Sequence, residues 1–132
     1  MTRRNWLLSL VPAALLTVVV GLGAAPALAH GDTKPKHGGI VQLIGETLFE
    51  LVAKPDGAEI YLVEDHEDAV AADFTGKIKV LSAGVSQDVA LVPGAGNKFT
   101  APGVKLASGA RAIVTLKRTL SGATVSARFS IP

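Results

Sequence analysis

The stretch TLFELVAKPDGAEIYLVE, residues 47–64, decides the fold class because apolar and polar side chains alternate on both sides of a turn sequence. Phe49, Leu51 and Ala53 fall on one face of its first half, whereas Glu50 falls on the other. Alternation with a period of two is typical of a half-buried β-strand. The intervening KPDG has the composition of a tight turn. The stretch therefore predicts a β-hairpin with one buried face.

The same alternation returns along the rest of the chain, in runs separated by glycine- and proline-containing turns. No window after residue 38 shows helical periodicity, and the connection 64–75 has room for at most one helical turn. We predict an all-β, antiparallel immunoglobulin-like β-sandwich of about seven strands over residues 39–132, with a small closed barrel as the alternative. The clearest runs after the hairpin are GKIKVL (76–81), SQDVALV (86–92), RAIVTLK (111–117) and ATVSARFSI (123–131).

Residues 1–29 have the layout of a secretory signal peptide. Two arginines precede an apolar stretch over residues 6–22, and the small residues Ala27 and Ala29 form an A-x-A cleavage pattern. We therefore predict export, cleavage after Ala29, a periplasmic location and no membrane attachment of the mature protein. Three alternatives stay open: cleavage after Ala27, an uncleaved anchor, and twin-arginine export in place of general secretion. Residues 30–38 are then a flexible, polar, histidine-containing arm.

The mature composition excludes several classes of partner and ligand. Two of the thirteen basic residues lie in the segment 1–29 and all eleven acidic residues follow it, so the mature protein has no net charge with its histidines neutral. Without a basic excess, nucleic acid is not an expected partner. The chain has no cysteine, and its single methionine, Met1, lies in the predicted signal peptide. A bound metal must therefore be held by imidazole, carboxylate, backbone or amine groups.

The predicted cleavage would make His30 the first residue of the mature protein. The free α-amine and the imidazole of an N-terminal histidine can chelate one metal ion, with Asp32 or His37 completing the ligand set. Cleavage after Ala27 would put His30 in third place, where the amine, two backbone amides and the imidazole form a Cu(II) or Ni(II) site. Cu(II) favours such nitrogen-rich sites. The alternative is that residues 30–38 are only a polar spacer.

The third histidine, His66, stands in the acidic sequence EDHED (64–68), beside Asp65. Because the loops of a sandwich gather at its ends, we predict that this loop and the arm can converge on one ion, with His30, His37, His66, Asp32 and Asp65 as ligands. Two structural alternatives stay open. The acidic loop can be a solvated surface loop, and His37-Gly38-Gly39 can be the start of the first strand, with His37 paired to a carboxylate such as Glu50 or Glu46.

The residues indicate no enzyme. No serine lies in a nucleophile elbow. The glycine-rich VPGAGNK (92–98) lacks the spacing and the following Ser or Thr of a phosphate loop.

The segment KHGGIVQLIGETLFELVAKPDGAEIYLVEDHEDAV (36–70), followed by GKIKVLSAG and the closing VSARFSI, resembles small exported bacterial proteins associated with heavy-metal and copper efflux systems. It is also similar to β-rich segments in the periplasmic adaptors of metal-exporting resistance–nodulation–division pumps. The likeness covers most of residues 36–131, and its most recognisable pieces are His37-Gly38-Gly39, Phe49-Glu50-Leu51-Val52 and Asp56-Gly57. A looser likeness to periplasmic copper carriers extends only to His30.

This resemblance implies a non-enzymatic periplasmic protein that binds a divalent transition metal, with Cu(II) preferred, in metal homeostasis or efflux. It also implies an efflux adaptor as a partner. The alternative function is an immunoglobulin-like protein–protein interaction module of the cell envelope with no metal role.

Overall fold

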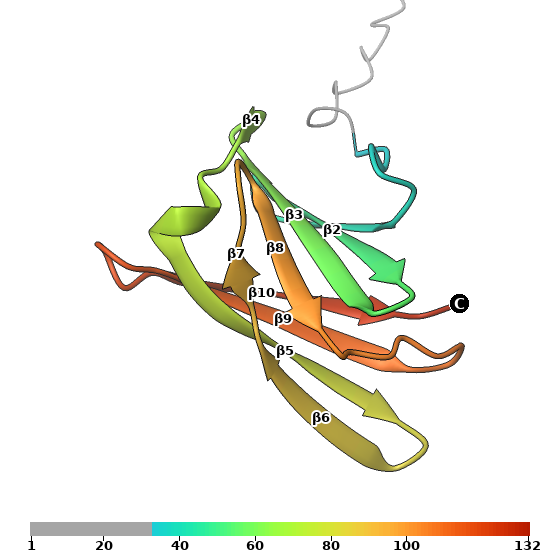
Figure 1. Cartoon of the computed structure of the whole chain (residues 1–132). Helices are drawn as coiled ribbons and strands as arrows, with labels where there is room; N and C mark the ends of the chain where they lie inside the picture. Colours follow the sequence, from blue (N-terminus) through green and yellow to red (C-terminus); the bar gives the residue numbers. More distant parts are fainter. Residues whose placement is uncertain (1–32) are drawn as a thin grey trace, which may run out of the picture.

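Residues 33–132, which the computed structural model describes, form two antiparallel β-sheets packed face to face (Figure 1). The predicted signal peptide, His30 and Asp32 lie outside the described residues. Within the described range, no helix is long and apolar enough to cross a membrane.

The first sheet has the strand order β1-β2-β3-β8-β7, and the two-residue β4 pairs with β3. The predicted hairpin forms its centre, because β2 and β3 are joined by the turn in KPDG and pair over their whole length. The strands of this sheet are β1 (Ile40–Ile44), β2 (Thr47–Lys54), β3 (Gly57–Glu64), β4 (Glu67–Asp68), β7 (Val92–Pro93) and β8 (Lys98–Pro102).

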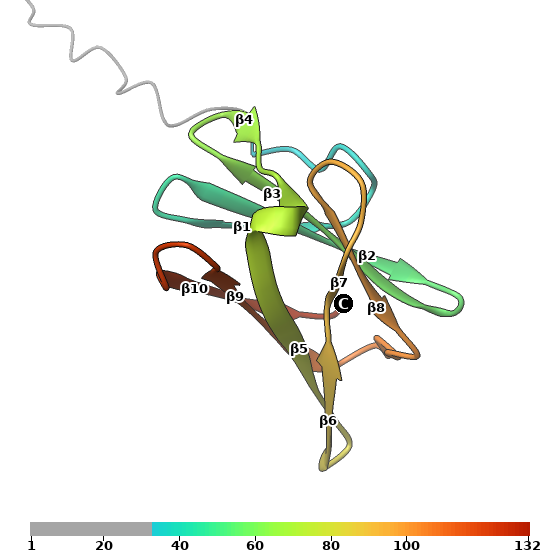
Figure 2. The same cartoon turned by 60° about the vertical axis from the view of Figure 1, so that its left-hand side comes forward.

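The second sheet has the order β10-β9-β5-β6, and a short 3₁₀ turn, η1 (Ala71–Asp73), leads into it from β4. The β5–β6 hairpin projects past the first sheet (Figure 2). The strands of this sheet are β5 (Phe74–Ser82), β6 (Val85–Ala90), β9 (Arg111–Arg118) and β10 (Thr124–Ser130).

The strand order is that of an immunoglobulin-like sandwich. The run β2-β3-β8-β7 corresponds to the A-B-E-D sheet of an immunoglobulin domain, and β10-β9-β5 corresponds to G-F-C. Strand β6 takes the C′ position, and β1 is an additional strand beside β2. The predicted fold class is therefore confirmed.

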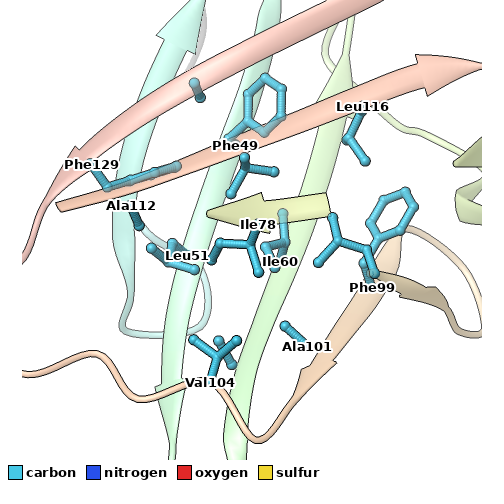
Figure 3. Close-up of a cluster of buried hydrophobic side chains, with 14 of the residues drawn as sticks. Phe49, Leu51, Ile60, Ile78, Phe99, Ala101, Val104, Ala112, Leu116 and Phe129 are labelled. Carbon is cyan, nitrogen blue, oxygen red and sulfur yellow. The ribbon is translucent and has the colours of Figure 1, made fainter. Parts of the chain in front are cut away.

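The core lies between the sheets and is built from the inward-facing positions of the predicted alternation (Figure 3). Phe49 on β2, Phe99 on β8 and Phe129 on β10 are its largest fully buried side chains. Packing three aromatic rings among aliphatic side chains removes a large apolar area from water, which is the main force that stabilises a domain of this size.

Several details differ from the sequence prediction, since residues 33–132 form ten strands rather than about seven. Strand β8 was not expected, because Lys98–Pro102 lies between two glycine- and proline-containing stretches that indicate turns. Its Phe99 and Ala101 nevertheless alternate toward the core. Ala53, predicted to face inward, is exposed, although its cross-strand partner Ala58 is buried in the core.

Candidate functional site

The most distinctive polar group of the described residues is Glu50, which is the one charged residue among them that is buried, with 2% of its surface exposed. It lies on β2 between the core residues Phe49 and Leu51, so its side chain points to the opposite, outer face of the first sheet. The sequence predicted a solvent-facing position there. The structure differs because the chain before β1 covers this face (Figure 1).

Four hydrogen bonds tie this covering segment to the Glu50 carboxylate. Oε1 accepts from the backbone N–H groups of His37, at 2.7 Å, and Gly39, at 3.0 Å. Oε2 accepts from the backbone N–H of Lys36, at 3.1 Å, and contacts Nδ1 of His37 at 2.9 Å. We call residues 36–39 the latch, because their hydrogen bonds fasten the segment directly before β1 onto the sheet.

The latch requires glycine at position 39, where its backbone lies close to Leu51 and Val52 on β2. A Cβ on Gly39 would lie 2.8 Å from Cγ2 of Val52 and press against the Leu51 carbonyl oxygen. Gly38 has φ of +75°, which glycine adopts without steric cost. These requirements explain why the sequence carries two glycines directly before β1.

The electrostatics of Glu50 are set by two opposing effects. Burial alone would raise the pKa of its carboxyl, but the hydrogen bonds from the His37 side chain and from the backbone of Gly39, His37 and Lys36 outweigh it and lower the pKa. Glu50 is therefore ionised at neutral pH and can only accept hydrogen bonds. Since its partner Nδ1 must then carry the proton, a neutral His37 has its free lone pair on Nε2.

The His37 ring is held from a second side by Tyr61 on β3. The two rings stack with their centroids 3.5 Å apart and their planes 5° from parallel. The Tyr61 hydroxyl donates to Glu59 Oε2 at 2.7 Å, and this bond, burial and the charges of Glu59 and Glu50 raise the pKa of Tyr61 to about 12. The imidazole is thus fixed by both a hydrogen bond and a flat apolar contact.

A cavity of about 340 Å³ opens beside this ring on the outer face of the sheet. Leu43, Leu48, Tyr61 and Val63 supply apolar surface, and His37 and His66 both line it. The remaining lining side chains and backbone come from Lys34, Lys36, Gly45, Glu46, Glu50, Asp68 and Asn97.

The predicted metal ligands are placed as follows. His37 and His66 line the same cavity. Asp65 does not line it; it lies in the turn after β3, and its backbone N–H donates to the carbonyl oxygen of Glu46 in the β1–β2 turn. Across residues 33–132, no group of three or more His, Cys, Asp or Glu side chains is arranged to hold a metal ion. His30 and Asp32 lie outside this range.

The structural alternative for His37 is confirmed, since the residue pairs with Glu50 rather than Glu46. The role of Tyr61 was not predicted, because its position follows from the cross-strand register Glu50↔Tyr61, which alternation alone does not give. No known protein family, curated protein or solved structure matches this chain.

Proposed function

We propose that this is an exported, non-enzymatic periplasmic protein that binds a divalent transition metal, preferably Cu(II), for metal homeostasis or efflux. The observation that carries the proposal is the Glu50–His37 pair. A metal-binding histidine commonly donates its second ring N–H to a carboxylate, which fixes the tautomer and makes the other nitrogen a better ligand. Glu50 holds His37 in that arrangement, with 39% of the His37 side chain exposed.

The choice of copper follows from the donor atoms. After removal of the predicted signal peptide, the protein offers no thiolate and no thioether. Imidazole nitrogen remains the strongest donor type, and among divalent first-row ions Cu(II) binds nitrogen ligands most tightly. Two histidines of the described residues line one cavity, and we propose that further ligands come from His30 and Asp32 in the arm or from water. A metal efflux adaptor is the proposed recipient of the ion.

Calorimetric titration of the exported protein with Cu(II) tests this proposal. We expect one equivalent of tight binding, which His37→Ala abolishes or strongly weakens. Glu50→Gln keeps the imidazole but loses its orienting carboxylate, so we expect affinity to fall about 10–100-fold. Glu59→Gln is the matched control, since Glu59 contacts Tyr61 but not His37. Wild-type binding no tighter than about 10 μM would refute the proposal.

A second candidate function, a protein-interaction module of the cell envelope, is supported by strand β6. It lies at the open edge of its sheet, and all its residues except Val89 are exposed. Val85 is 68% exposed and Leu81 on the neighbouring β5 is 42% exposed. An open edge offers unpaired backbone groups, to which an extended segment of a partner can add as a further strand.

Retention of envelope proteins on the immobilised protein separates the two functions. The interaction module predicts that Val85→Lys lowers retention, whereas a chelator and His37→Ala leave it unchanged. Leu120→Lys is the matched control, because Leu120 is 95% exposed in the turn between β9 and β10, away from β6. Equal retention by the wild type and Val85→Lys would exclude docking at this edge.

A further inference from the structure

The two-residue turn between β3 and β4 carries an unfavourable backbone conformation. Asp65 has φ of +49° and His66 has φ of +69°. Turns with both central residues at positive φ strongly prefer Asn-Gly or Asp-Gly, because a Cβ is disfavoured in this region. The β5–β6 turn follows that preference, with Ala83 at φ of +49° and Gly84 at +78°. At the second position, where β5–β6 has glycine, β3–β4 has histidine.

Nothing in the described fold requires that histidine. No hydrogen bond, ion pair or ring contact among residues 33–132 engages the His66 side chain, and the residue is exposed. A glycine would form the same turn at lower cost. Backbone conformations of this kind cluster at functional sites, and His66 lines the same cavity as His37.

The carboxylates around His66 are partly committed to structural contacts. Glu64 forms an ion pair with Arg118, whose guanidinium also lies over the Phe74 ring at 4.5 Å. Asp68 accepts a hydrogen bond from Nδ2 of Asn97 at 3.3 Å. The imidazole of His66 is therefore the nitrogen donor that this loop can offer at the cavity, which His66 lines.

We propose that His66 is the second imidazole ligand of the metal that His37 binds, so that a divalent transition ion bridges the latch and the β3–β4 turn. This inference rests on the proposed metal-binding function and adds that the ion links the latch to the β3–β4 turn. One histidine precedes β1 and the other follows β3, so the bound ion would join the segment before β1 directly to the turn after β3. Metal binding should therefore also raise the thermal stability of the domain.

The test compares His66→Gly with Ala83→Gly in the exported protein, with Cu(II) as the probe. Both changes remove a Cβ from a positive-φ position, so both should raise the melting temperature of the metal-free protein by a few degrees. Only His66→Gly should lower Cu(II) affinity, by about tenfold or more, and reduce the melting-temperature increase that Cu(II) causes. His66→Asn tolerates positive φ and lacks the imidazole, so it should lose affinity to the same degree.

The outcomes separate this inference from the function on which it rests. Wild-type affinity in His66→Gly and His66→Asn, together with loss of binding in His37→Ala, would overturn the role of His66 and leave metal binding by His37 standing. An equal loss in Ala83→Gly would also overturn it, because the effect would then come from general changes in the fold. Absence of Cu(II) binding by the wild type would refute both proposals.

Discussion

Replacement of Glu50 by glutamine tests whether the latch stabilises the whole domain. The change keeps the size of the side chain but removes its charge and turns one acceptor oxygen into a donor. In the wild type each carboxylate oxygen accepts two hydrogen bonds. The glutamine oxygen can keep one such pair. Its amide nitrogen then faces the donors of the other pair, so the backbone N–H of Lys36 or of Gly39 loses its acceptor.

The magnitude follows from the charge assistance that is lost. A hydrogen bond to a charged group contributes about 1.5–3 kcal/mol, against about 0.5–1.5 kcal/mol for a neutral pair. The substitution affects four hydrogen bonds. If the latch detaches from the sheet, its N–H groups bond to water instead, so the domain can lose no more stability than the latch contributes by binding to the sheet. We expect the free energy of unfolding to fall by about 2–4 kcal/mol. For a domain of this size that lowers the melting temperature by roughly 10–25 °C.

Two measurements check this prediction. Thermal unfolding at neutral pH gives the change in stability, and the rate of tryptic cleavage after Lys36 reports release of the latch, which should be faster in Glu50→Gln. Glu67→Gln serves as the control, because Glu67 is exposed on β4. A melting temperature and a cleavage rate equal to those of the wild type would show that the latch contributes nothing to stability.

The same pair of proteins gives a pH dependence with a defined sign. The pKa of Glu50 is lowered from 4.5 in the folded protein, so the unfolded chain takes up the proton first as the pH falls. The stabilisation is fully present above about pH 5 and is lost as the pH falls through the folded pKa. The difference in melting temperature between wild type and Glu50→Gln should be constant above about pH 5 and narrow below about pH 4. If the difference in melting temperature stayed constant down to strongly acidic pH, the ionised Glu50 carboxylate would not be the source of the stabilisation.

Three further predictions concern the surroundings of the latch. Tyr61 is the only tyrosine of the chain, so tyrosinate absorbance should titrate near pH 12, and Glu59→Gln should move the midpoint down toward the ordinary value of about 10. Gly39→Ala should lower stability by about 1–3 kcal/mol in urea unfolding, because its Cβ presses on the Leu51 carbonyl; an unchanged midpoint would show that the strand shifts freely. Phe49→Ala should cost about 3–5 kcal/mol in the same assay, and a loss below about 1 kcal/mol would contradict its central place in the core.

The strand pattern could be predicted from the sequence because inward positions along β2, β3, β9 and β10 carry apolar side chains with few exceptions. Alternation is a local property, and each strand shows it alone. Strand β8 was missed because its five residues are too few to outweigh the turn signals on both sides. The role of its Phe99 becomes visible only when β8 pairs with β3.

The candidate site was less predictable because it depends on contacts between separate segments. Glu50 was placed correctly on the face opposite Phe49, but its burial depends on a covering segment that alternation does not report. The pairing of His37 with a carboxylate was foreseen from the His-Gly-Gly sequence. His37 and His66 line one cavity because of the β2–β3 register and the position of the β3–β4 turn. Neither of these can be predicted from a local sequence pattern.

The latch also has a consequence for the order of folding. Its hydrogen bonds to Glu50 join residues only 11 to 14 positions apart, whereas the pairing of β3 with β8 closes a much longer loop. Short loops lose less chain entropy on closure and form sooner. The latch, β1, β2 and β3 therefore make a local unit of contacts between segments that lie close together in the sequence. We expect this unit to reach native-like pairing early and to offer β8 an edge on which to add.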